Sequence, residues 1–132
     1  MLEIGRFNSL PIKKNTGTQI YLDAHDAGDL LLTDKHLPRE AKVGGLLNVF
    51  IYTGSEGELL ATCKKPFVQM DGVAWLKVIA IGRAGAFLDW GIAKDLLVPF
   101  SEQDYELEEG NYCLVKVFLD EQKRIAASTE LN

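Results

Sequence analysis

Apolar and polar residues alternate along short stretches of the chain, and glycine, aspartate or serine separates these stretches. A period of two is typical of β-strands with one buried face, and such turn residues mark strand ends. The pattern predicts strands at 6–14, 18–24, 29–33, 46–53 and 57–63, and again at 72–82, 85–90, 95–99, 111–119 and 123–129. Each half of the chain is therefore expected to be all-β, with five strands.

The two halves also repeat each other without a gap. A shift of 66 residues, half of the 132, places Leu22 on Leu88, Asp29 on Asp95, and Gly44 on Gly110. Only 11 of the 66 aligned positions are identical, but the matches cluster in the apolar runs. A repeat of this kind indicates one module used twice. We expect one domain at 1–65 and a second at 66–132, joined at Pro66, because proline cannot donate to a strand ladder.

A longer segment separates the third and fourth predicted strands in each half. Residues 100–104 predict a helical turn with Ser101 as its cap, and residues 34–43 occupy the same place in the first half. Five strands with a short helical turn at this point is the layout of an OB-type barrel, a Greek-key β structure. Two tandem five-stranded OB barrels are therefore predicted.

The charge is unevenly distributed along the chain. Residues 1–66 carry 8 basic and 8 acidic side chains, whereas residues 67–132 carry 6 and 11, which accounts for the net charge of −5. General electrostatic binding of nucleic acid needs a basic surface. Any contact with nucleic acid is therefore expected to be local and to rely partly on stacking. The acidic residues from Glu102 to Glu109 are typical of a solvated edge.

Several function classes find no support in the sequence. There is no signal peptide at the start and no run of about 18 apolar residues, so we expect a cytoplasmic protein without a membrane segment. Cys63 and Cys113 lack metal-type spacing and are expected to be reduced, buried thiols. His25 and His36 have no ligand partner nearby in sequence and are expected to be solvated loop residues. With no nucleophile–base pair, metal cluster or phosphate loop, we expect neither an enzyme nor a cofactor site.

Four sequence motifs in the second half resemble the S1 RNA-binding domain: Gly85-Ala86-Phe87-Leu88-Asp89, Asp95-Leu96-Leu97-Val98-Pro99, Val115-Lys116-Val117 and Arg124-Ile125. Together with Trp75-Leu76-Lys77-Val78 they resemble, more narrowly, the conserved virulence factor B family. Those are bacterial cytoplasmic proteins with several S1-type domains and a winged helix. The match is strong over 72–128, and over 5–64 it rests mainly on the repeat. The resemblance implies an amino-terminal fragment with two S1-type OB barrels, further carboxy-terminal domains, and single-stranded RNA as the ligand.

The resemblance also implies where RNA would bind. Phe87 matches the stacking aromatic of the family, and Asp120 and Arg124 match its polar pair. Two family positions differ, because Ala84 replaces an aromatic residue and Pro99 replaces a histidine. In the first domain the five corresponding positions hold Thr18, Tyr21, Thr33, Gly54 and Glu58. Only Tyr21 remains there as a stacking candidate.

Strand alternation sorts the aromatic residues of the second domain. Phe87 and Asp89 share one side of their strand, whereas Trp90 falls on the other side and is expected in the core or at the junction between the domains. Trp75 and Lys77 share a side of the preceding strand, and Lys77 must reach water. Both are therefore candidate RNA contacts, with packing between the domains as the alternative for Trp75.

These observations together favour a bacterial post-transcriptional regulator that binds single-stranded RNA by stacking and a few polar contacts. The alternative is a protein-interaction or scaffold module whose barrels do not bind RNA themselves. The acidic second half, Ala84, Pro99 and the poor motif in the first half favour the alternative, whereas Phe87 and Arg124 favour direct binding.

Overall fold

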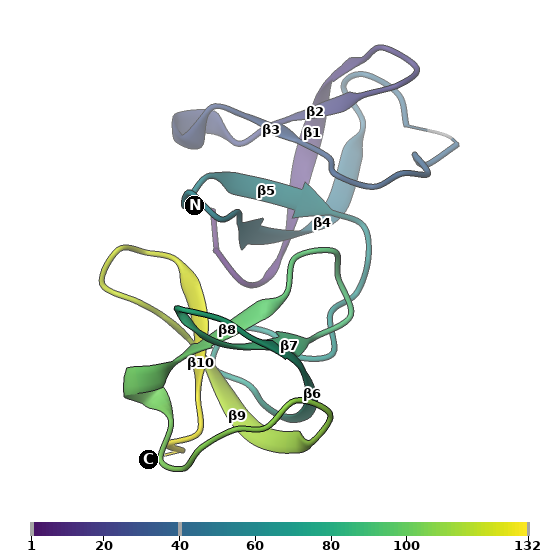
Figure 1. Ribbon diagram of the computed structural model, residues 1–132. Helices are drawn as coiled ribbons and strands as arrows, with labels where there is room; N and C mark the ends of the chain where they lie inside the picture. The colour runs from purple at the N-terminus through teal and green to yellow at the C-terminus, as the bar shows by residue number, and fades with distance from the viewer. Residues whose placement is uncertain (1, 40, 132) are drawn as a thin grey trace. The chain divides into compact units, whose positions relative to one another are not determined.

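The protein forms two β-barrels in tandem. The computed structural model describes residues 2–39 and 41–131, and the chain divides into two compact units, Met1–Lys65 and Pro66–Asn132. Each unit holds one antiparallel five-stranded sheet, and 3-10 turns are the only helical elements in the described residues (Figure 1). None of these is long and apolar enough to cross a membrane. The predicted all-β fold with tandem OB barrels is confirmed.

The first barrel contains β1 (Phe7–Asn15), β2 (Ile20–Asp23), the 3-10 turn η1 (His25–Ala27), β3 (Asp29–Leu31), β4 (Leu46–Thr53) and β5 (Leu59–Thr62). Its sheet has the order β3-β2-β1-β4-β5. A parallel bridge between Leu32 and Ala61 joins the two edges, and Thr33 N–H donates to the Ala61 carbonyl at 2.8 Å. The sheet therefore curls until its first and last strands meet.

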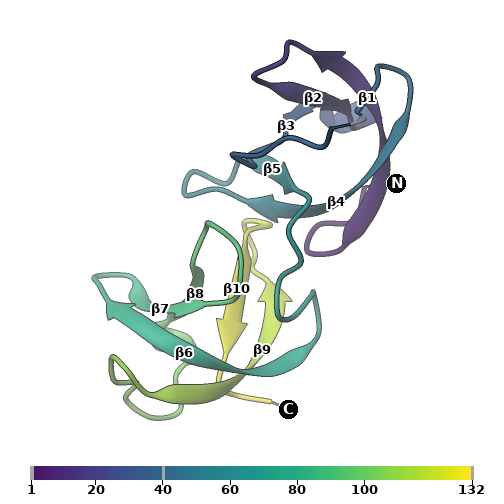
Figure 2. The same ribbon diagram turned by 90° about the vertical axis from the view of Figure 1, so that its right-hand side faces the viewer.

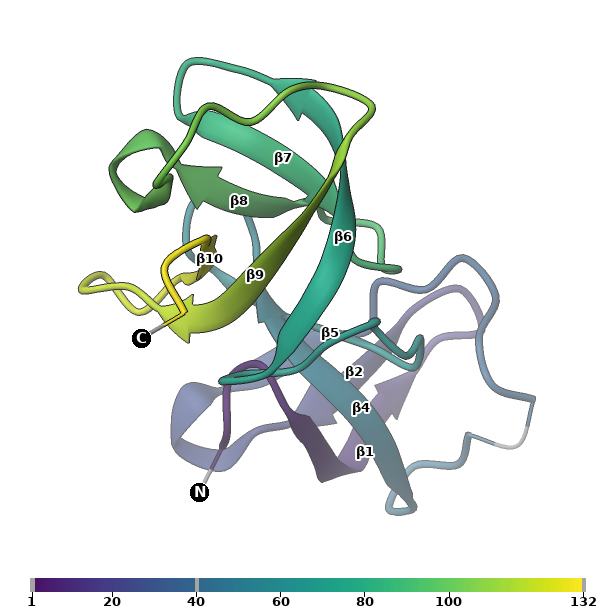
Figure 3. The same cartoon turned by 90° about the horizontal axis from the view of Figure 1, so that it is seen from below.

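The second barrel contains β6 (Val73–Ile81), β7 (Gly85–Asp89), β8 (Leu96–Pro99), the 3-10 turn η2 (Phe100–Glu102), β9 (Tyr112–Leu119) and β10 (Ile125–Ser128). The order β10-β9-β6-β7-β8 is that of the first barrel read from the other edge. The strands β6 and β9 are long, curved and adjacent (Figures 2 and 3), and β8 contacts β10. Both halves therefore have one topology.

A bulge lies at the same place in both barrels. The register of β1 against β2 shifts between Ile12 and Lys14, and that of β6 against β7 shifts between Val78 and Ala80, 66 residues later. An extra residue bends a strand and increases its twist. The bulge therefore helps one long strand pair with β2 or β7 at one end and with β4 or β9 at the other.

The core follows the sequence repeat position by position. The first barrel buries Leu10, Ile12, Ile20, Leu22, Ala24, Leu30, Leu32, Val49, Ile51 and Ala61. The residues 66 positions later are also buried: Leu76, Val78, Ala86, Leu88, Trp90, Leu96, Val98, Val115, Val117 and Ala127. Trp90 is thus interior, as alternation predicted, and its indole N–H donates to the Lys94 carbonyl.

The helical turn in the second barrel differs from its prediction. The 3-10 turn begins directly after β8, so Pro99 occupies the cap position, no side chain caps the turn, and Ser101 lies inside it. The prediction of Ser101 as cap is wrong, because the strand runs into the turn without a loop. The described part of 34–43 holds no matching turn, and the 3-10 turn of the first barrel lies instead between β2 and β3.

Candidate nucleic-acid interface

The β9–β10 hairpin of the second barrel is organised by Asp120. Its Oδ1 accepts backbone N–H groups from Gln122 at 2.9 Å and from Arg124 at 2.8 Å. Its Oδ2 lies 3.4 Å from Arg124 Nε. One carboxylate therefore closes the turn and holds the arginine side chain. Asp120 was predicted to contact the ligand, but both of its oxygens already have partners within the hairpin.

Arg124 lies at an open pocket of about 420 Å³ in the second barrel. The pocket is lined by Pro99, Ser101, Glu102, Phe118, Leu119, Asp120, Glu121, Gln122 and Arg124. Three positions that the family resemblance singled out, Pro99, Asp120 and Arg124, thus meet at one place. The arginine side chain is 44% exposed, and only its Nε contacts the carboxylate in the described residues, so its terminal nitrogens can reach an external anion.

Phe87 lies on the outer face of the barrel beside this pocket. On β7 it pairs with Leu97 of β8, and Gly85, two residues earlier, pairs with Pro99. The ring is partly covered by the β6–β7 turn, because a Cβ added at Gly82 would lie 3.0 Å from Phe87 Cε2. Leu88 is fully buried, so the predicted alternation along this strand is confirmed.

Gly85 has a steric role in placing Phe87. Its φ is +149°, and an added Cβ would overlap the carbonyl oxygen of Val98. Only glycine lets β7 approach β8 this closely. The glycine of the Gly85-Ala86-Phe87 motif therefore sets the strand spacing from which the aromatic ring projects.

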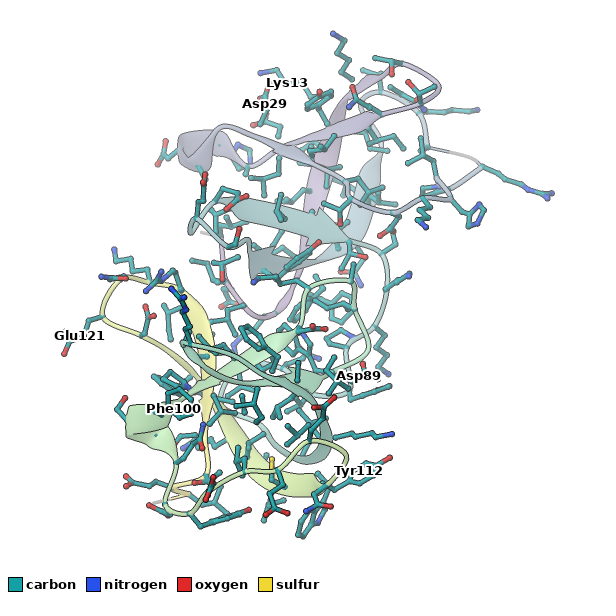
Figure 4. The ribbon with its side chains drawn as sticks, viewed as in Figure 1. Lys13, Asp29, Asp89, Phe100, Tyr112 and Glu121 are labelled. Atoms are coloured by element: carbon teal, nitrogen blue, oxygen red, sulfur yellow. The ribbon has the colours of Figure 1, made fainter. Side chains whose placement is uncertain are left out.

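Trp75 and Lys77 lie on a separate part of the outer surface, across β6 and β9. The side chain of Trp75 is 66% exposed, so it does not pack into the core of its own barrel. Lys77 pairs with Asp89 on β7 and with Tyr112 on β9. Figure 4 shows Asp89 and Tyr112 on one side of this barrel, and Phe100 and Glu121 on the other. The structure therefore does not bring Trp75 and Lys77 to Arg124.

Tyr112 was missed by the sequence reasoning. Its side chain is 63% exposed and belongs to the same surface as Trp75, because the pairs Trp75–Leu114 and Lys77–Tyr112 are neighbours along β6 and β9. Aromatic side chains on diagonal positions of paired strands are within reach of each other. The signal was available, because the apolar residues Cys113, Val115 and Val117 alternate along this strand and are buried, so Tyr112 faces outward.

The first barrel has the same hairpin with the opposite charge. Gly54 N–H donates to the Glu58 carbonyl at 2.8 Å, as Asp120 N–H does to Arg124 in the second barrel. The Glu58 side chain folds back, so that Oε1 accepts the Glu56 N–H at 3.0 Å and the carboxylate fills the space that a Gly54 side chain would need. An acid thus stands where the second barrel has its arginine.

Tyr21 is the aromatic residue of the first barrel at the position of Phe87. It lies half-buried on β2, pairs with Lys14 and Leu31, and its hydroxyl lies 3.2 Å from Gln19 Oε1. Its position on the strand corresponds to that of Phe87, but the hairpin of this barrel, residues 54–58, contains no arginine. The stacking position and the hairpin cation are therefore found together only in the second barrel.

The cysteines and histidines form no site. Both thiols are free, with Cys113 buried and Cys63 only partly buried, and burial raises the pKa of Cys63 to about 11. His25 and His36 are exposed. Among the described residues no group of three or more His, Cys, Asp or Glu side chains could hold a metal ion.

The chain is similar to known proteins. The S1 domain model matches residues 4–64 and 73–130. Conserved virulence factor B from Staphylococcus aureus USA300 is 31% identical over 90 residues, which are 65% of this chain and 30% of that protein. The protein of the same name from Staphylococcus haemolyticus is 27% identical over 120 residues, 88% of this chain and 38% of its own length. The inferred resemblance to conserved virulence factor B is confirmed, and the chain spans about a third of these relatives.

A solved structure has the same fold. A multidomain protein with nucleic acid binding domains from Streptococcus pneumoniae TIGR4 superposes with a TM-score of 0.78 at 18% sequence identity. The superposition covers 94% of this chain and 45% of that one. The fold, the repeated strand order and a family match to both barrels agree, and the chain belongs to the S1 domain family.

Proposed function

We propose that the chain binds single-stranded RNA and that the second barrel makes the stacking and phosphate contacts. The observation that carries this proposal is the Asp120–Arg124 pair beside an open pocket. An arginine held through Nε keeps the donors of its terminal nitrogens for phosphate oxygens, which it binds in a fixed geometry. The carboxylate positions the guanidinium, and the guanidinium meets the RNA backbone.

Phe87 supplies the stacking contact. Its ring lies on the outer face of β7, one strand from Pro99 at the pocket. Stacking of a base on an aromatic ring contributes about 1–3 kcal/mol and depends little on base identity. Trp75 and Tyr112 extend the exposed aromatic surface, so that it can hold a longer single strand of RNA, and Lys77 lies next to them on β6. Membership of the S1 family and the likeness to a streptococcal protein with nucleic acid binding domains support this proposal.

The second candidate function is a protein-interaction module. The observation in its favour is that Trp75 and Tyr112 are 66% and 63% exposed on a barrel with a net charge of −5. Aromatic residues are enriched at protein interfaces, and an acidic surface repels a nucleic acid backbone. In this alternative, other parts of a longer protein bind RNA and the two barrels hold a protein partner.

A titration of the chain with labelled single-stranded RNA of about 12 nucleotides, at about 50 and 200 mM salt, tests the proposal. Phe87→Ala should weaken binding by about 1–3 kcal/mol. Arg124→Ala should lower the slope of log affinity against log salt by about 0.7, the contribution of one phosphate contact. Tyr105→Ala and Lys65→Ala remove an exposed aromatic and an exposed cation outside the interface, so they are the matched controls.

Two results would count against the proposal in different ways. If the unaltered chain has no affinity for RNA at the lower salt, RNA binding is wrong and the protein-interaction module remains. If RNA binds but Phe87→Ala and Arg124→Ala behave like the two controls, the chain binds RNA through another surface.

A further inference from the structure

A pocket in the first barrel gathers basic side chains. It has a volume of about 790 Å³ and is lined by Gly17, Thr18, Lys35, His36, Leu37 and Arg39. Gly17 and Thr18 belong to the turn between β1 and β2, and the other residues belong to the segment between β3 and β4. Lys35, His36 and Arg39 are exposed. Two segments distant in sequence thus place two permanent cations and a histidine around one depression.

These cations are not neutralised within the described parts of the chain. No ion pair there joins Lys35, His36 or Arg39 to a carboxylate. The carboxylate of Asp34, their nearest acidic neighbour among the described residues in sequence, is engaged elsewhere: Oδ1 accepts from the Thr62 hydroxyl, and Oδ2 accepts from Cys63 N–H at 2.8 Å. The pocket therefore presents positive charge to solvent.

The ion pair between Lys13 and Asp29 is separate from the pocket. Lys13 Nζ lies 2.9 Å from Asp29 Oδ1, and Figure 4 shows the two side chains next to each other. Neither residue lines the pocket. A lysine of the same barrel thus has a carboxylate partner, whereas Lys35 and Arg39 have none in the described residues. The positive charge of the pocket is a local feature and not a property of the barrel as a whole, whose half of the chain is neutral.

The second barrel provides an internal comparison, because the same segment there is acidic. Between 35 and 44 the sequence holds Lys35, Arg39 and Lys42 against one glutamate, whereas 101–110 holds five acidic residues and no basic one. At matched positions, His36 corresponds to Glu102 and Lys42 to Glu108. The fold does not require either charge, since both barrels have one topology. The basic character belongs to the surface of the first barrel alone.

We propose that this pocket binds phosphate groups, and that a single-stranded nucleic acid supplies them. Arginine binds phosphate oxygens through parallel N–H donors, and lysine adds a compact point charge. Thr18, which lines the pocket, directly precedes Gln19, whose Oε1 lies 3.2 Å from the hydroxyl of Tyr21. The hairpin of the first barrel lacks an arginine, and this barrel thus binds the phosphates of the nucleic acid through the segment between β3 and β4 instead. This inference rests on the proposed function.

The test compares two doubly substituted chains that lose equal charge. Lys35→Gln with Arg39→Gln neutralises the pocket, and Lys64→Gln with Lys65→Gln removes two exposed lysines that do not line it. Each is titrated with an oligouridylate of about 12 nucleotides at about 50 and 200 mM salt. Loss of two phosphate contacts lowers the slope of log affinity against log salt by about 1.4. When the salt rises from about 50 to about 200 mM, the affinity of the lysine control should therefore fall about sevenfold further than that of the pocket variant. The NMR chemical shifts of the backbone amides of Thr18, Lys35 and Arg39 should also change when the oligouridylate is added.

The results separate this inference from the proposed function. If the pocket variant matches the lysine control while Phe87→Ala and Arg124→Ala still weaken binding, the pocket is not a nucleic-acid site and the proposed function stands. If the unaltered chain binds no oligouridylate, both fail. Vesicles of phosphatidylglycerol are the second arm: binding to vesicles that the pocket substitutions abolish, with no effect on the oligouridylate, would assign the pocket to lipid phosphates and overturn the proposal.

Discussion

Asp120 and Arg124 contact each other twice across the β9–β10 turn. The backbone N–H of Arg124 donates to Asp120 Oδ1 at 2.8 Å, and Arg124 Nε lies 3.4 Å from Asp120 Oδ2. The same turn in the first barrel places Gly54 and Glu58 at these positions, and the glutamate folds back over the glycine. Two hairpins with one backbone geometry therefore carry side chains of opposite charge at one matched position, Arg124 and Glu58. This difference predicts that the barrels contribute unequally to any anionic ligand.

The two roles of Asp120 can be separated by two substitutions. Asp120→Asn keeps an oxygen that can accept the turn N–H groups but loses the negative charge beside Arg124, so the free energy of unfolding should change by less than about 1 kcal/mol. Asp120→Ala removes both turn hydrogen bonds and should destabilise the barrel by about 1–2 kcal/mol. Chemical denaturation measures both values. Equal stability of the two variants would show that the turn does not depend on this side chain.

Each barrel should fold by itself, because its ten repeated core positions lie within one half of the chain. Residues 66–132, expressed alone, should give the dispersed amide shifts of a β protein in a two-dimensional NMR spectrum. Small domains of this size bury only about 60% of their unfolded surface, so the fragment should be less stable than larger domains. A spectrum with random-coil shifts would show that the halves fold only together.

Leu88→Ala should destabilise the second barrel by about 2–5 kcal/mol, because it leaves a cavity at a fully buried site. Ile81→Ala is the matched control, since Ile81 is 44% exposed at the end of β6, and it should cost less than about 1 kcal/mol. Denaturant midpoints of the isolated second barrel or of the chain compare the two. If the two substitutions lower the free energy of unfolding equally, the Leu88 side chain of β7 does not face the core.

Gly85→Ala and Gly110→Ala distinguish steric overlap from backbone conformation. Both glycines have positive φ, +149° and +90°, but an added Cβ meets the Val98 carbonyl only at Gly85 and nothing within 4 Å at Gly110. Gly110→Ala should cost about 1 kcal/mol from backbone strain. Gly85→Ala should cost more, because β7 and β8 must separate. Thermal unfolding of both variants measures this order, and a smaller cost at Gly85 would contradict the close strand contact.

The sequence predicted the fold and the core because both depend on local rules. Alternation assigns buried faces strand by strand, and the 66-residue repeat transfers each assignment to the other barrel, as Leu22 and Leu88 illustrate. The cap at Ser101 was wrong because its position depends on where β8 ends, which alternation does not fix to one residue.

The candidate site was harder to predict because it depends on strand register and on loops. Lys77 and Tyr112 lie far apart in the sequence, and only the pairing of β6 with β9 places them opposite each other. Asp120 holds the hairpin together through hydrogen bonds within the turn. The pocket of Lys35 and Arg39 forms where the segment between β3 and β4 meets the turn between β1 and β2. None of these follows from a periodic pattern.

The hairpin charge can be transferred from the second barrel to the first. Gly54→Asp with Glu58→Arg reproduces the Asp120–Arg124 pair, and the arginine frees the space that the Glu58 carboxylate now occupies. If a hairpin arginine meets RNA phosphate, the salt slope of binding should rise by about 0.7 for the added contact. Gly54→Asp alone is the control, because it places two carboxylates in one space and should destabilise the barrel without improving affinity. Circular dichroism verifies folding before the RNA titration. A folded double variant whose affinity and salt slope equal those of the unaltered chain would show that a cation at this hairpin does not contact RNA in the first barrel.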